Sequence, residues 1–180
     1  TAPEPGRITL AHQITTPEQG RKIVEELAAQ RVDIVKIWVD SRDGKFTKLS
    51  PEIYGAIIDE AHKHNLRVAV HATDPPEAKD LLRAGIDVFA HMISDVDDEM
   101  VALFKQHPNT VVLSVLGTPR RPIYIPWINP PHPLITETVL PEQIARLQSR
   151  FPVKDPKQIA KVTDDWEKLK RGVARLRAAD

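Results

Sequence analysis

The feature of this sequence that most constrains its fold is a repeated alternation of short apolar runs with segments of helical length. The apolar runs cover 33–39, 66–71, 86–91 and 110–116. The helices expected around them cover 17–30, 51–64, 75–84 and 96–106. Strands that alternate with helices of this length form βα units around a parallel sheet. The runs are continuously apolar, which is typical of strands that are covered on both faces.

Local signals mark where these helices begin and end. Thr16, Ser50 and Asp74 each stand directly before a proline, and this pairing places a capping residue before a proline in the first helical position. Asn65 and Gly85 follow two of the helical segments, and both residue types close helices. The sequence therefore predicts four βα units in one α/β domain over 1–180.

The alternation stops at about residue 117. The segment 117–141 holds seven of the sixteen prolines together with large apolar side chains, which predicts an ordered loop or lid. Long loops in compact domains are usually functional, so Arg120, Tyr124 and His132 are candidates for contact with substrate. A long C-terminal helix is expected after Asp155, because apolar residues then recur at spacings of three and four up to Leu176.

Composition narrows the classes of partner and of metal site. Lys and Arg number 25, as do Asp and Glu, so the net charge is zero, which argues against nucleic acid as the main partner. No apolar run approaches the ~20 residues of a membrane-spanning helix. The chain has no cysteine, so a metal would need His, Asp, Glu or a modified side chain. A soluble protein without membrane association is expected.

Three nitrogen-bearing side chains interrupt the apolar runs. Lys36 lies towards the end of the first run, and His71 and His91 close the second and third. Strand C-termini share one rim of a parallel sheet, and ligands bind at that rim. Imidazole is a common zinc ligand. A buried ammonium is costly, but burial favours the neutral amine, which can react with carbon dioxide to give an anionic carbamate that binds metal.

With these residues in place, the chain resembles the metal-dependent amidohydrolase superfamily, in particular its imidazolonepropionase- and prolidase-like branch. The resemblance covers nearly the whole chain and rests on four segments: "VDIVKIWVD", "LSPEIYGAIIDEAHKHNLRVAVHA", "AKDLLRAGIDVFAHM" and "DVDDEMVALFKQ". It implies a TIM (β/α)8 barrel, of which this chain would be the central part, about strands four to seven. It also implies one or two divalent metal ions, usually zinc, that activate water to attack an amide or related C–N bond.

By the same resemblance, Lys36 matches the carboxylated lysine of the fourth strand, and His71 and His91 match the ligands of the fifth and sixth strands. Two family motifs have no match here: the His-x-His pair of the first strand and the Gly-Thr-Asp of the eighth. The family's catalytic aspartate is thus absent from this chain, and no catalytic residue is assigned. Weak binding of a single metal ion is the most that the chain alone should achieve.

Other functions remain open at this point. A truncated barrel could be catalytically inactive and act as a module that associates with a partner or with a second copy through its open sheet edges. Lys36 could also stay an amine and form a Schiff base with a carbonyl substrate. For the hydrolase, the resemblance implies a small-molecule or peptide-like substrate, and homo-oligomers are expected because the sheet edges are open.

Overall fold

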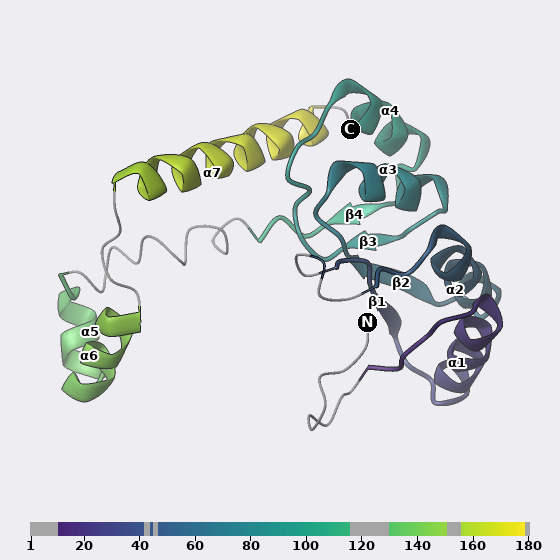
Figure 1. Cartoon of the computed structure of the whole chain (residues 1–180), viewed down its shortest axis with the longest axis horizontal. Helices are drawn as coiled ribbons and strands as arrows, with labels where there is room; N and C mark the ends of the chain where they lie inside the picture. Colours follow the sequence, from purple (N-terminus) through teal and green to yellow (C-terminus); the bar gives the residue numbers. More distant parts are fainter. Residues whose placement is uncertain (1–10, 42–43, 45–46, 116–129, 151–155, 179–180) are drawn as a thin grey trace. The chain divides into compact units, whose positions relative to one another are not determined.

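The computed structural model describes residues 11–41, 44, 47–115, 130–150 and 156–178. Its centre is a four-stranded parallel sheet with the strand order β1-β2-β3-β4 (Figure 1). The strands are β1 (Ile34–Trp38), β2 (Arg67–His71), β3 (Val88–Phe89) and β4 (Val111–Val112). The helices α1 (Pro17–Ala29), α2 (Pro51–Lys63), α3 (Pro75–Arg83) and α4 (Asp98–Gln106) alternate with them. The α/β class and the partial barrel of parallel βα units are therefore confirmed.

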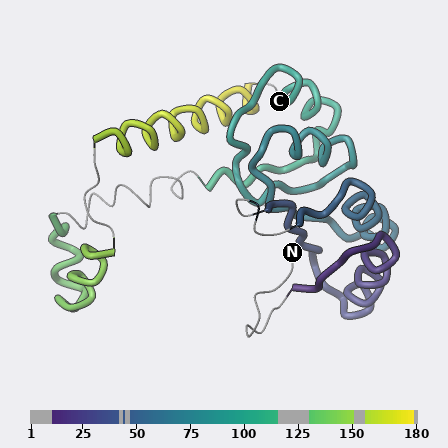
Figure 2. The backbone as a smooth tube through the Cα atoms, viewed as in Figure 1, coloured from purple at the N-terminus to yellow at the C-terminus, as the bar shows by residue number. Residues whose placement is uncertain are grey.

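The chain divides into two compact units, residues 1–114 with 172–180, and residues 115–171. In the first unit the backbone passes from helix to strand four times in succession (Figure 2). The second unit holds α5 (Pro133–Thr138) and α6 (Pro141–Arg150). The long helix α7 (Pro156–Arg177) has its last turns in the first unit. The single domain expected over 1–180 stays a prediction.

The residues predicted to begin and end the helices stand at the helix ends. The Thr16 hydroxyl accepts a hydrogen bond from the Gln19 amide at 3.3 Å, so α1 begins at the expected cap. Ser50 and Asp74 occupy the same position before α2 and α3, although their side chains make no capping hydrogen bond. Asn65 and Gly85 have φ of 56° and 82°, the left-handed conformation in which helices commonly end.

The core lies on one face of the sheet. Figure 1 shows α1 to α4 on the same side of the strands. The side chains of Ile37, Val70 and Phe89 stand in register on that side and are buried. One register position earlier, the side chains of Lys36, Ala69, Val88 and Val111 stand in a row on the other face of the sheet. Val111, on the edge strand β4, is 45% exposed. In the same row Ala69 and Val88 are 8% exposed, so this face is shielded in the middle of the sheet and exposed at its β4 edge. The expectation of strands covered on both faces stays a prediction.

Several element bounds differ from the expected ones. The strands β3 and β4 are two residues long, shorter than their apolar runs. Helix α4 begins at Asp98 rather than 96, because the Asp97 carboxylate accepts from the Met100 amide at 2.8 Å and caps the helix there. Residues 133–138, within the segment expected to be a loop, form α5. Helix α6 was not predicted.

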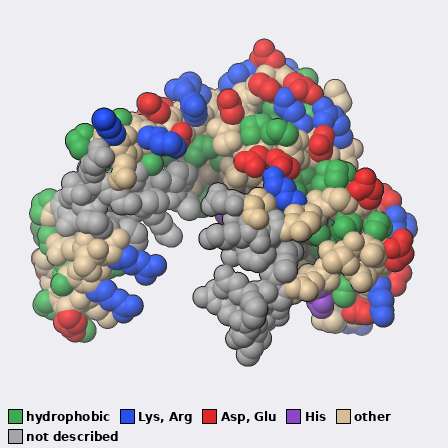
Figure 3. All heavy atoms as spheres, in the orientation of Figure 1, with side chains coloured by type: hydrophobic (Ala, Val, Ile, Leu, Met, Phe, Trp, Pro, Cys, Tyr) green, Lys and Arg blue, Asp and Glu red, His purple; other side chains and the backbone are tan. Residues whose placement is uncertain are grey.

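Ion pairs join α3 to α4 on the surface. The Lys79 Nζ lies 2.6 Å from carboxylate oxygens of Asp97 and Glu99, and Arg83 reaches Glu99 at the same distance. Figure 3 shows basic and acidic side chains interspersed over these two helices. None of the helices in the described part of the chain is both long and apolar enough to cross a membrane.

Candidate functional site

Lys36 is the central residue of β1, not one near its end, and it pairs in register with Ala69 of β2. Trp38 and His71 form the next register pair on the same face, so Lys36 lies one layer below the rim on the face away from the helices. The residue as a whole is exposed. Its amine is nevertheless partly shielded from water, and this burial lowers the pKa of Lys36.

The two predicted histidines meet at the rim. His71 is the last residue of β2, and His91 follows β3 by two residues. Their ring centroids lie 4.5 Å apart in an edge-to-face arrangement. Burial lowers the pKa of His91, and the neighbouring charges of His71 and Lys36 lower it further. The structure therefore brings the two predicted histidines together, with Lys36 one layer below them on its strand.

Two further residues at the end of β1 belong to this cluster, and sequence reasoning missed them. The Trp38 ring lies 4.5 Å from the His71 ring, between centroids. The Asp40 Oδ2 lies 3.1 Å from the His71 Nε2 and accepts a hydrogen bond from the Trp38 Nε1 at 3.4 Å. The spacing could have indicated them, because residues 36, 38 and 40 recur with the period of two that places side chains on one strand face.

The donor chemistry of this cluster can be tested against a divalent metal. In the residues that the structure describes, no three His, Cys, Asp or Glu side chains are placed to hold a metal ion. Two imidazoles alone are too few for the usual zinc site, which has three or four protein ligands. A carbamate on Lys36 would supply the missing oxygen donor, and the lowered pKa of the amine favours it. The set therefore fits a metal if Lys36 is carboxylated.

The described residues do not test the three predicted contacts with substrate. Arg120 and Tyr124 lie outside the described residues. His132 caps α5 in the second unit, where its Nδ1 accepts from the Leu134 amide at 3.2 Å. Their contact with substrate stays a prediction.

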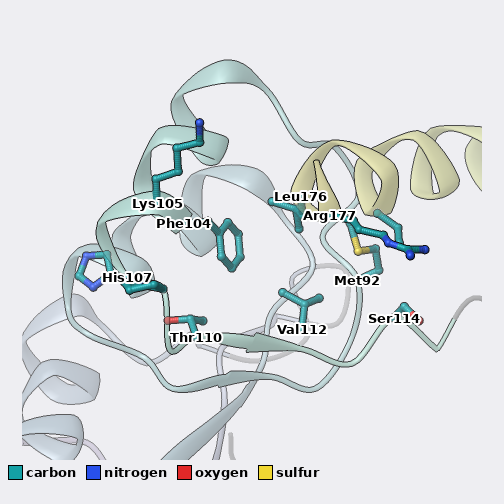
Figure 4. A pocket seen from close by; sticks show the side chains of 11 residues that line it. Met92, Phe104, Lys105, His107, Thr110, Val112, Ser114, Leu176 and Arg177 are labelled. Atoms are coloured by element: carbon teal, nitrogen blue, oxygen red, sulfur yellow. The ribbon is translucent and has the colours of Figure 1, made fainter. Parts of the chain in front are cut away.

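A pocket of ≈ 600 Å³ lies elsewhere in the first unit, among α4, β4 and the end of α7 (Figure 4). Phe104, Val112 and Leu176 line it, and Figure 4 shows their side chains directed into it. Val112 is in register with the buried Phe89, so it stands on the helix-covered face, opposite to that of Lys36. Neither Lys36 nor the two histidines of the cluster line this pocket.

Comparison with known proteins adds information on the fold. No family model matches the chain. An uncharacterised protein of Mycobacterium tuberculosis is 30% identical over 87 residues, which are 48% of this chain and 23% of that protein. A candidate prolidase from Bifidobacterium longum superposes with a TM-score of 0.63 at 22% identity, covering 99% of this chain and 40% of its own. The crystal structure of an amidohydrolase superposes with a TM-score of 0.60 at 19% identity, covering 94% and 37% respectively.

The chain thus spans about two fifths of the length of the solved structures that it matches. Sequence identities near 20% show a shared fold and leave activity open. The match to the Bifidobacterium longum structure covers nearly every residue of this chain. It therefore includes the four βα units on which the sequence resemblance rests. The chain therefore has the fold of part of an amidohydrolase barrel.

Proposed function

We propose that Lys36, His71 and His91 form the metal-binding part of a hydrolase that cleaves an amide or related C–N bond. One observation carries the proposal. The ring centroids of His71, at the end of β2, and His91, two residues beyond β3, lie 4.5 Å apart, and a lysine of lowered pKa stands on the same face of the sheet as His71. Strand C-termini are where this barrel architecture carries its active sites.

Lys36 would enter the site as a carbamate. Its neutral amine nitrogen attacks the carbon of carbon dioxide, forming an N–C bond while one C=O electron pair moves onto oxygen. The nitrogen then releases a proton to water, so the product is a carbamate anion with two oxygen donors. The lowered pKa of Lys36 supports this step, because more of the amine is neutral near pH 7 than for an ordinary lysine.

The histidines would supply the nitrogen donors. A metal ligand must be the neutral imidazole, and the lowered pKa of His91 favours that form. A divalent ion such as zinc, when bound, supplies Lewis acidity that polarises a carbonyl and lowers the pKa of water. The Trp38 ring lies beside His71 and is 36% exposed, so it offers an apolar surface to a substrate at this rim.

The substrate would be small and peptide-like. We base this on the Bifidobacterium longum protein, which is described as a candidate prolidase. This chain shares the fold of about two fifths of that protein. The family's proton-accepting aspartate has no match in this chain, so turnover belongs to the complete protein. The chain by itself should bind metal weakly and show little hydrolysis.

Metal titration in the presence and absence of bicarbonate tests this function. We expect calorimetry to show zinc binding that bicarbonate strengthens in the wild type and leaves unchanged in Lys36→Met. His71→Ala and His91→Ala should each lower zinc affinity by more than about 10-fold, since even outer-shell partners are worth 10- to 100-fold. Lys22→Met, an exposed lysine on α1, is the matched control and should behave as the wild type. Zinc affinity that none of the three cluster variants changes would contradict the proposal.

The lowered pKa of Lys36 also favours a second candidate, an amine nucleophile that forms a Schiff base with a carbonyl substrate. Borohydride would reduce such an adduct to a stable secondary amine. Mass spectrometry of peptides containing Lys36 after treatment with borohydride and a small aldehyde would detect it. A trapped adduct that zinc and bicarbonate do not suppress would favour this chemistry over the hydrolase.

A further inference from the structure

We infer that Asp40 is a positioning residue, which holds the His71 imidazole with its proton on Nε2 and so leaves Nδ1 as the nitrogen that binds metal. The inference rests on the proposed function, and it adds a residue that the sequence resemblance does not assign. Three observations carry it: a hydrogen bond, the protonation rules of imidazole, and the way in which β1 and β2 meet.

The first observation is the contact itself. The Asp40 Oδ2 lies 3.1 Å from the His71 Nε2, within hydrogen-bond distance. The side chains are 33% and 20% exposed respectively, so both are partly shielded from water. Trp38 donates its Nε1–H to the same carboxylate oxygen at 3.4 Å, which helps to fix the direction of the carboxylate.

The second observation is chemical. An ionised carboxylate only accepts hydrogen bonds, so the His71 Nε2 must carry the proton in this contact. A neutral imidazole carries one proton, and its other nitrogen, here Nδ1, then carries the lone pair in the plane of the ring. A metal ion needs that lone pair and cannot share Nε2 with the proton. The Asp40 contact thus selects which nitrogen is available to a metal.

The third observation is that the end of β1 holds His71 in more than one way. Trp38 and His71 are a register pair, and the Val39 amide donates to the His71 carbonyl at 2.9 Å. The Trp38 ring lies against the His71 ring, 4.5 Å between centroids. Three consecutive residues therefore contact His71: Trp38 through its ring, Val39 through its backbone amide and Asp40 through its carboxylate. This arrangement holds the imidazole in one orientation before any metal arrives.

The tautomer can be measured without metal, which separates this inference from the proposed function. Nitrogen-15 NMR of the metal-free protein at about pH 8.5, well above the ordinary imidazole pKa of ~6.5, reports which nitrogen carries the proton. We expect His71 of the wild type to show the Nε2–H form alone. Asp40→Ala should show the averaged shifts of two exchanging tautomers. An Nδ1–H form or averaged shifts in the wild type would overturn the inference.

Zinc titration tests the consequence. Asp40→Ala should lower zinc affinity by about 10- to 100-fold, the usual effect of losing such a partner. Asp40→Asn should keep most of the affinity, because its amide oxygen can still accept the Nε2–H. Asp33→Ala, at the other end of β1, is the matched control and should bind as the wild type. Thermal unfolding of each variant shows whether it is folded.

Two results of that titration would overturn the inference while zinc binding by the wild type stands. Equal affinity in Asp40→Ala and wild type would show that the contact does not position His71. An equal loss in Asp40→Asn and Asp40→Ala would show that charge or direct ligation, not the hydrogen bond, is what Asp40 contributes. Zinc binding absent from the wild type would instead remove the proposed function, and the NMR result would still report the tautomer.

Discussion

At the residue scale, Lys36 decides what chemistry the open face of the sheet can carry. As an ammonium it repels a metal ion, and as a carbamate it binds one. We predict that Lys36→Ala in the complete protein lowers hydrolysis by more than about 100-fold, beyond the upper end for outer-shell partners. Added acetate or propionate should restore part of the rate, because a short carboxylate can occupy the vacated space and supply the missing oxygen donors. Steady-state kinetics with and without these acids make the measurement.

Lys36→Arg is the matched control for charge in that experiment. An arginine keeps a positive side chain of similar length, but it stays protonated at all working pH values and forms no carbamate. It should therefore be as inactive as the alanine variant, and acetate should not rescue it because the side chain still fills the space. Wild-type turnover in either variant without added acid would contradict the assigned role of Lys36.

At the element scale, the contact between α1 and α2 depends on a glycine. A Cβ placed on Gly20 would lie 2.8 Å from the Cγ1 of Ile57, a residue that is 1% exposed. Gly20→Ala should lower the free energy of unfolding by about 1–3 kcal/mol, the usual effect of overpacking. Gly55→Ala, within α2, meets nothing within 4 Å and should raise it by about 0.5–1 kcal/mol through helix propensity. Urea unfolding of both variants tests the opposite signs, and two changes of the same sign would contradict this account.

The ion pairs between α3 and α4 predict acid sensitivity. Hydrogen bonds from Lys79 lower the pKa of Asp97 and of Glu99. Carboxylates with lowered folded-state pKa values contribute stability above their unfolded pKa of about 4, and this contribution is lost as the pH falls through the lowered values. The pKa of Lys79 is raised, so its contribution is retained at all pH values below about 10. The melting temperature should therefore be level from about pH 5 to 9 and fall below about pH 4.

Lys79→Met is the variant that tests this origin of the acid sensitivity. It removes the cation that both carboxylates share, so its melting temperature should fall less between pH 6 and pH 3 than that of the wild type. Lys105→Met, on the same helix as Glu99, is the matched control and should keep the wild-type slope. Identical slopes in Lys79→Met and the wild type would show that the acid sensitivity arises elsewhere.

The elements also show how far the sequence alone could go. Helices α1 to α3 were predicted almost to the residue, because capping residues, prolines and left-handed C-terminal residues are local signals. Strands β3 and β4 are shorter than their apolar runs, because a strand ends where its pairing ends and pairing is a tertiary property. Strand-end logic placed His71 beside His91, and their ring centroids lie 4.5 Å apart. Asp40 was missed because it lies beyond the apolar run, although its spacing from residues 36 and 38 could have indicated it.

At the scale of the whole molecule, the sheet has an open face and open edges. On the first strand Ile34 and Trp38 are exposed on this face, and on the side of β4 Val111 and Leu113 are exposed as well. Among the described residues, β1 and β4 each pair with one strand only. The solved structures that share this fold are about two and a half times longer than this chain. Exposed apolar side chains and unpaired strand edges of this kind favour association.

We therefore predict that the 180-residue chain, expressed alone, self-associates through the open face of its sheet. Sedimentation velocity should show dimers or larger species at micromolar concentration, and Leu113→Lys should shift them towards monomer, because a charge on an apolar interface is costly to bury. Leu140→Lys is the matched control, since Leu140 is an exposed leucine of the second unit and should leave the distribution unchanged. A wild-type chain that stays monomeric, or equal effects of the two lysine variants, would show that the open face does not drive association. If zinc affinity rises with the degree of association, the metal site and the closure of the barrel depend on the same covered face, because burial by the partner would further favour the neutral Lys36 amine.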